Sequence, residues 1–285
     1  MTRTLFCFGY GYSARALGAL LLREGGWRII GTTRDPQKAE ALRAEGVEPV
    51  IWPGSDIEAE LTAATHLLIS AGPGEEGDPV LAALSDGMAR IAPRLAWAGY
   101  LSTTGVYGDH AGDWVDEETP LTPGTRRGLL RQQAEAAWRA VPELPLHIFR
   151  LAGIYGPGRG PFAKVRSGKA RRIIKEGQVF SRIHVEDIAR IVAASMHAPD
   201  PGAIYNLCDD DPAPPQDVIA YAAELLGLPL PEAVPIEEAE MSEMARSFYA
   251  ESKRVSNERI KRDLGITLAY PTYRDGLRAM MEGED

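Results

Sequence analysis

Short apolar runs alternate with longer amphipathic segments through the first two thirds of the chain. The runs predict strands at Thr4–Gly9, Trp27–Thr33, Glu48–Trp52, His66–Ala71 and Leu146–Leu151, and one that ends as Tyr100–Thr103. The amphipathic segments predict helices at Ser13–Arg23, 36–44, 79–90 and Arg126–Ala140. Strands that alternate with helices in this order are typical of a parallel sheet.

Two of these helices have the same start signal. Asp35-Pro36 and Asp78-Pro79 each place a capping side chain before a proline at the first helical position. After Gly156 the pattern becomes irregular, with a short strand expected near Val179 and a helix at Val185–Met196. We therefore expect an α/β fold, a doubly wound parallel sheet over 1–155 with a smaller mixed C-terminal lobe over 156–285, together forming one compact unit.

Composition narrows the function classes. The net charge of −9 argues against nucleic acids and anionic membranes as partners, because both require a dominant positive field. Only Cys7 and Cys208 occur, so neither a disulfide framework nor a metal cluster is indicated. No segment approaches the roughly 18 apolar residues of a membrane span. A cytoplasmic protein without a metal is the expectation.

A glycine-rich segment joins the first strand to the first helix. Gly9-Tyr10-Gly11-Tyr12-Ser13-Ala14 has small residues where a turn must be tight, where the backbone approaches a pyrophosphate, and where helix packs on strand. The helix N-terminus then offers N–H groups and partial positive charge to the phosphates. The segment predicts a Rossmann dinucleotide site; the alternative is an ordinary tight turn.

The end of the second strand indicates which dinucleotide is bound. The strand runs out as Thr33-Arg34, and an arginine there suits the 2′-phosphate of NADP. Asp35 is the competing residue, since an acidic side chain would favour NAD, but its place before Pro36 suits a helix cap. We expect NADP as the cofactor, with NAD as the alternative. The alternative for Arg34 itself is an ordinary surface residue with no role in binding. Ser70, Ala71 and Gly72, where the fourth strand ends, are further expected cofactor contacts.

Three later motifs resemble the extended and atypical short-chain dehydrogenase/reductases, the epimerase/dehydratase family. They are Leu101–Gly108, which ends in Val-Tyr-Gly, Arg150–Gly158, and Arg182–Asp187 with its His-Val-x-Asp pattern. The resemblance covers nearly the whole chain and implies that Thr103 is the catalytic Ser/Thr. For the last motif, the alternative is structural, because Glu186 and Asp187 suit a first helical turn.

The family's Tyr-x-x-x-Lys pair is absent. The register implied by the resemblance places Arg127 at the tyrosine position and Arg131 at the lysine position. No tyrosine occurs between Gly108 and Ile154, and arginine cannot act as a general base. Arg131 is left as a candidate for holding the ribose. Tyr107 and Tyr155 are candidates for a displaced acid/base with a lowered pKa; alternatively, both are packing residues.

A basic run lies between Pro157 and Lys175 and contains no acidic residue. In relatives this region binds the nucleotide-diphosphate part of the substrate, which implies an anionic small-molecule substrate held by Arg159, Arg166, Arg172 and Arg182. The alternative is a solvated basic face or a partner surface.

Two functions remain open on the sequence. The first is an NADP(H)-dependent, epimerase/dehydratase-like oxidoreductase that acts on a phosphorylated or nucleotide-linked substrate without the usual pair. The second is a catalytically inactive NADP-binding sensor. Relatives also suggest a homodimer through the helices near Leu81–Arg90 and Arg126–Ala140.

Overall fold

The computed structural model describes residues 3–84 and 87–283. The chain divides into two compact units, which we describe separately. Unit 1 comprises Met1–Thr103, Leu130–Arg150 and Ile188–Tyr205, and unit 2 comprises Thr104–Leu129, Leu151–Asp187 and Asn206–Asp285. The units interleave along the chain, so the expected division at 155/156 stays a prediction. No helix of the described residues is long and apolar enough to cross a membrane.

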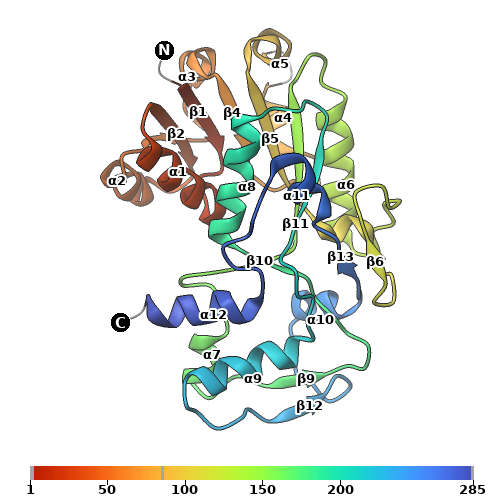
Figure 1. The fold of residues 1–285 in the computed structure, drawn as a ribbon. Helices are drawn as coiled ribbons and strands as arrows, with labels where there is room; N and C mark the ends of the chain where they lie inside the picture. The colour runs from red at the N-terminus through yellow and green to blue at the C-terminus, as the bar shows by residue number, and fades with distance from the viewer. Residues whose placement is uncertain (1–2, 85–86, 284–285) are drawn as a thin grey trace. The chain divides into compact units, whose positions relative to one another are not determined.

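The central sheet has seven strands in the order β11-β7-β5-β4-β1-β2-β3 (Figure 1). Their bounds are β1 Arg3–Phe8, β2 Trp27–Thr33, β3 Glu48–Ile51, β4 His66–Ile69, β5 Trp97–Thr103, β7 Leu146–Leu151 and β11 Ile204–Leu207. Strand β1 pairs in parallel with both β2 and β4, so the strand order reverses beside β1. In a doubly wound sheet this reversal is where a ligand binds, at the carboxyl ends of the strands.

Four predicted helices, α1, α2, α6 and α8, begin and end within one residue of their expected bounds. The helices of the described residues are α1 Tyr12–Glu24, α2 Pro36–Ala44, α3 Glu58–Ala63, α4 Pro79–Leu84, α5 Met88–Ile91, α6 Arg126–Arg139, α7 Phe162–Arg166, α8 Val185–His197, α9 Pro215–Leu225, α10 Glu243–Tyr249, α11 Glu258–Leu264 and α12 Tyr273–Glu282. Short 3-10 turns lie at η1 Ala92–Arg94 and η2 Thr104–Tyr107.

Two sequence predictions about secondary structure were inaccurate. The expected helix over 79–90 is α4 followed by α5, with Gly87 at the start of α5; residues 85–86 lie outside the described residues. No strand forms at Val179, because Gly177 turns the backbone with a φ of +71° and only Phe180 makes an isolated bridge, to Ala213. The strands of this region flank it, as β9 Arg172–Ile174 and β10 Arg182–His184.

Alternating side chains of the sheet build the core of unit 1. Phe6 and Phe8 on β1 share a cluster with Val80 of α4 and Trp138 of α6. Helix α8 is joined to the sheet by Trp97 of β5, which donates its indole N–H to the Ser195 hydroxyl of α8 over 3.1 Å. The period of two along each strand therefore gives the sheet an apolar surface on both faces, as a doubly wound sheet requires.

A buried ion pair joins α6 to two strands of the sheet. The Arg150 guanidinium on β7 donates to both carboxylate oxygens of Glu135 on α6, at 3.2 and 2.8 Å. The Ser102 hydroxyl on β5 donates to the same carboxylate over 2.5 Å. Glu135 is 3% and Arg150 2% exposed, so each charge depends on the other for its solvation.

Histidines and tryptophans form a second buried group in unit 1. His66 on β4 lies edge-on to Trp27, 4.8 Å between ring centroids, and 6.4 Å from Trp97. Burial, reinforced by the positive charges of Arg3 and His197, lowers the pKa of His66 from its ordinary 6.5 to about 4. His66 therefore stays neutral in the folded protein at moderately acid pH.

Unit 2 contains three two-stranded sheets, each of one parallel pair. β10 pairs with β8 Gly153–Tyr155, β9 with β12 Ala233–Pro235, and β6 Trp114–Val115 with β13 Arg254–Val255. Its core gathers residues from α7, α9 and α12 around Tyr155. Gly276 on α12 is required there, since a Cβ at that position would lie 2.2 Å from the Tyr155 hydroxyl.

Glu135→Gln should destabilise the protein strongly, because it leaves the Arg150 charge buried without a countercharge. We expect a loss of about 3–5 kcal/mol in the free energy of unfolding, measured by urea denaturation. Glu237→Gln, a change at an exposed carboxylate, should cost less than about 0.5 kcal/mol. Equal losses in the two variants would show that the buried pair is not what holds α6.

The stability of the protein should decline in mild acid because of His66. The unfolded chain takes up a proton near pH 6.5 and the folded one only near pH 4, so stability is full above pH 6.5 and falls as the pH drops towards 4. At about 1.4 kcal/mol per pH unit, this separation allows a loss of up to about 3 kcal/mol. His66→Phe should flatten the fall in unfolding free energy between pH 6.5 and 4. Parallel curves for the two proteins would contradict the assignment.

Candidate functional site

The loop after β1 is held by the two strands that flank it. The Gly9 amide donates to the Thr32 hydroxyl over 2.8 Å, and the Tyr10 amide to the Thr32 carbonyl over 2.9 Å. Gly9 has a φ of +79°, and a Cβ there would lie 2.9 Å from the amide nitrogen of Ala71. Both the conformation and the close approach of the loop after β4 therefore require glycine.

Tyr10 contributes only its main chain to the outer surface of this loop. Its side chain is buried and covers two glycines, because a Cβ at Gly18 would lie 1.8 Å from the Tyr10 hydroxyl and one at Gly31 2.7 Å from its Cγ. Burial also raises the pKa of the Tyr10 phenol. The expected cofactor contact of Tyr10 is thus restricted to backbone atoms.

Helix α1 begins directly behind the loop. Gly11 occupies the cap position in an extended conformation and provides no side-chain hydrogen bond to the first turn. Ser13 and Ala14 are buried against the sheet, as small residues at this position allow. The positive end of the helix dipole therefore meets the glycine loop without an intervening capping side chain, which is the arrangement that binds phosphate.

Arg34 and Asp35 differ in their engagement at the end of β2. The Asp35 carboxylate accepts the Gln37 amide proton over 2.9 Å, which confirms it as the cap of α2. Asp35 itself donates its amide to the Thr33 hydroxyl over 3.1 Å. The Arg34 side chain is exposed. Asp35 is thus used as a helix cap, and Arg34 is the charged residue at this corner whose side chain does not serve as one.

Arg131 of α6 lies at the carboxyl edge of the sheet. Its guanidinium donates to the Leu101 carbonyl over 2.6 Å and to the Tyr100 hydroxyl over 3.3 Å. A Cβ at Gly72 would lie 3.2 Å from the Arg131 Nη2. The structure thus brings Arg131 together with the loop after β4, which contains Ser70, Ala71 and Gly72. Desolvation raises the pKa of Tyr100 to about 12, with the Arg131 charge acting against the rise.

The two candidate tyrosines are packed inside unit 2. Tyr107 has no exposed surface, and its hydroxyl donates to the Asn206 side chain over 2.7 Å. Tyr155 lies edge-on to His184, and desolvation raises its pKa instead of lowering it. This geometry favours the packing interpretation for both. Thr103 is half-buried at the end of β5.

The His-Val-x-Asp segment has structural contacts. The Asp187 carboxylate accepts the amide protons of Ala269 and Tyr270 at 2.8 and 2.9 Å. His184 is buried with its ring 4.0 Å from that of Tyr270, and desolvation lowers its pKa. No cluster of potential metal ligands occurs among the described residues.

The basic residues differ in what they contact. Arg172 donates to the Pro231 carbonyl beside the β9–β12 pair, and Arg182 donates to the carbonyls of Phe180 and Ala213. Arg166 is exposed, with its guanidinium 5.7 Å from the centre of the Phe162 ring, and Arg159 is exposed. Arg172 and Arg182 thus hold unit 2 together, whatever else they bind.

Arg127 has its own aromatic partner within unit 2. Its guanidinium carbon lies 4.7 Å from the centre of the Phe248 ring on α10. Arg131 makes its contacts within unit 1, as described above. The two arginines of α6 thus make these contacts in different units.

One charged pair was missed by the sequence analysis. Lys253 is buried and donates to the carbonyl of Gly108, in the Val-Tyr-Gly motif, over 2.6 Å, and to the Glu251 carboxylate over 2.8 Å. The other oxygen of Glu251 is buried without a hydrogen-bond partner. The pair lies 145 residues from Gly108 along the chain, so no local spacing in the sequence signals it.

Comparisons with known proteins give matches that cover nearly the whole chain. No protein-family model matches the chain. It is 30% identical over 280 residues to Protein YeeZ of Escherichia coli (strain K12), covering 92% of this chain and 94% of that protein. It is 63% identical to the structure of a functionally unknown conserved protein from Silicibacter pomeroyi DSS, with a TM-score of 0.95 and 99% of both chains covered.

More distant similarities carry functional names. A Streptomyces protein, 3-diazoavenalumate denitrifying reductase, is 27% identical over 197 residues, which is 66% of this chain and 63% of that protein. The structure of the human epimerase family protein SDR39U1 with NADPH has a TM-score of 0.74 at 18% identity, covers 98% of both chains, and shows the shared fold. The chain therefore belongs to the family of Protein YeeZ.

Proposed function

We propose that the protein is an NADP(H)-dependent oxidoreductase that acts on a small anionic substrate without the usual tyrosine–lysine pair. The observation that carries this proposal is the glycine loop. Gly9 leaves no room for a side chain, Gly11 leaves the start of α1 uncapped, and both lie where the strand order of the sheet reverses. These features suit a pyrophosphate and serve no evident packing purpose at Gly11.

The residues of unit 1 fit a dinucleotide phosphate at two further points. Arg34 is an exposed cation at the end of β2, and the nearby Asp35 is engaged as a helix cap. Arg131 presents a guanidinium beside Gly72. When bound, the reduced cofactor supplies a hydride; Arg34 would hold its 2′-phosphate and Arg131 its ribose. Structures with this fold hold NADPH in SDR39U1 and NAD in MoeE5 and a Bacillus cereus epimerase, so the choice of NADP rests on Arg34.

The proton for such a reaction needs a source other than Tyr107 or Tyr155, because both are packed. Glu251 and Lys253 form an ionisable pair at the Val-Tyr-Gly motif, and one Glu251 oxygen has no partner. Lys253 is as buried as Tyr155, and the free Glu251 oxygen is buried too, so we assign the proton transfer to none of these residues. A reductase among the relatives supports an active enzyme, whereas the absence of the tyrosine and lysine from α6 supports the second candidate, an NADP-binding sensor.

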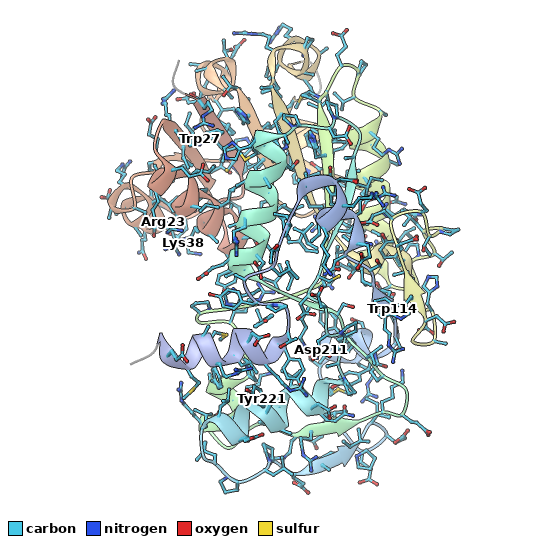
Figure 2. All side chains as sticks on the ribbon, viewed as in Figure 1. Arg23, Trp27, Lys38, Trp114, Asp211 and Tyr221 are labelled. Atoms are coloured by element: carbon cyan, nitrogen blue, oxygen red, sulfur yellow. The ribbon has the colours of Figure 1, made fainter. Side chains whose placement is uncertain are left out.

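Cofactor preference tests the first part of the proposal. Calorimetric titration should show tighter binding of NADPH than of NADH, and Arg34→Ala should weaken NADPH binding roughly tenfold, since an Arg–phosphate contact contributes about 1.5 kcal/mol at a partly exposed site. NADH binding should not change. Arg23→Ala is the matched control, because Arg23 is also an exposed arginine of unit 1 (Figure 2). Wild-type affinity for NADH equal to that for NADPH would refute the assignment of Arg34.

The absent pair predicts what the protein does not catalyse. With NADP⁺ and 2-propanol, followed at 340 nm from pH 7 to 10, the wild type should show no turnover, because no tyrosinate base is present on α6. Arg127→Tyr combined with Arg131→Lys restores the family's side chains and tests whether they suffice for activity. Turnover by the wild type with an alkaline optimum would mean that our register for α6 is wrong.

A further inference from the structure

One cavity of unit 2 lies away from the motifs that resemble the family. It has a volume of about 540 Å³, within the range of small-molecule sites. Helix α9 forms one wall, the chain that follows it a second, and the start of α12 a third; the lining residues are Asp217, Ala220, Tyr221, Ala223, Glu224, Leu228, Leu230, Tyr273 and Arg274. We call it the α9 pocket.

The charge of the α9 pocket is negative. Among the described residues, neither Asp217 nor Glu224 has a side-chain ion pair or hydrogen bond. Arg274 is the basic residue of the lining, and its charge is compensated by Asp211 at 2.9 Å. Two carboxylates therefore remain uncompensated. They lie seven residues apart on α9, which is about 10 Å along the helix axis.

An aromatic and apolar surface lies between the two carboxylates. Tyr221 stands one turn after Asp217, and its ring packs against Tyr273 at 6.0 Å with an interplanar angle of 85°. The Arg274 guanidinium lies 4.5 Å from the Tyr273 ring centre and 5.8 Å from that of Tyr221, so this aromatic pair already accommodates a cation. Figure 2 labels Tyr221 on α9 and Asp211 in the preceding loop.

Two observations indicate that the pocket is open to a ligand. Leu228 and Leu230 line it yet are 40% and 58% exposed, so their apolar surface lacks a covering partner. Tyr273 is 1% exposed and its hydroxyl has no hydrogen-bond partner among the described residues; burial raises the pKa of this phenol, and the Arg274 charge acts against the rise. A ligand that neutralises Asp217 and covers the leucines would fit the charge and the apolar surface of the lining.

We propose that the α9 pocket binds a linear aliphatic polyammonium compound, with one terminal ammonium group at Asp217, the other at Glu224 and the chain between them against Tyr221, Leu228 and Leu230. Such a ligand matches the two separated charges and the apolar surface between them. A compact divalent metal ion does not, because the carboxylates stand too far apart to share it. This binding is independent of the dinucleotide loop and of the proposed reaction.

The test is calorimetric titration with spermidine and with butylamine at low ionic strength. Spermidine should bind the wild-type protein more tightly than butylamine, which has one ammonium group, and salt should weaken the binding. Asp217→Asn with Glu224→Gln should weaken spermidine binding about tenfold, since each exposed ion pair contributes roughly 0.5–1 kcal/mol. Glu237→Gln with Glu238→Gln removes two exposed carboxylates outside the pocket and should leave the affinity unchanged.

Several results would overturn the proposal. They are the absence of spermidine binding to the wild type at millimolar concentration, equal losses in the two double variants, or full displacement of spermidine by equimolar Mg²⁺. Tyr221→Leu provides a second measurement, because it keeps the carboxylates and an apolar side chain but should weaken spermidine binding several-fold through loss of the ring. NADPH titration of every variant shows whether the fold and the dinucleotide site are intact, so failure here is distinguishable from failure of the proposed function.

Discussion

The ion pair between Glu135 and Arg150 fixes helix α6 against the central sheet. Neither charge is solvated by water, so α6 keeps its position against β5 and β7 only while both partners are present. Ser102 joins the same carboxylate one residue before Thr103. The contacts of Arg131 with Leu101 and Gly72 follow from that placement. The chain thus holds α6 firmly against the sheet, with Arg131 at the carboxyl edge.

The dinucleotide loop and the α6 region therefore carry different information about function. Around Gly9 the requirements are geometric: a positive φ, close backbone approach and an uncapped helix, all of which are retained. On α6 the requirement is a group that transfers a proton, and arginine does not meet it. Binding and catalysis are separable in this fold for that reason. In unit 2, the ionisable pair of Lys253 and Glu251 contacts the Val-Tyr-Gly motif through the Gly108 carbonyl.

The sequence predicted those features that depend on neighbouring residues. The strand at Trp27–Thr33, the helix from Pro36 to Ala44 and the capping role of Asp35 follow from local periodicity and turn chemistry, and all are found as expected. Features set by distant contacts were not predicted. The inward position of Tyr10, the carbonyl contacts of Arg172 and Arg182, and the Lys253 pair each depend on residues far away in the chain. A basic run looks the same in a sequence whether its arginines face solvent or hold two loops together.

The packing of Tyr10 over Gly18 and Gly31 bears on how variation in this family is interpreted. The three positions share one volume: the phenol occupies the space that side chains at 18 and 31 would need. A relative with alanine at either glycine therefore needs a smaller residue at position 10, and that exchange leaves the phosphate-facing backbone untouched. Loss of one of these glycines is then evidence of compensated packing, whereas a change at Gly9 or Gly11 alters the backbone of the loop itself.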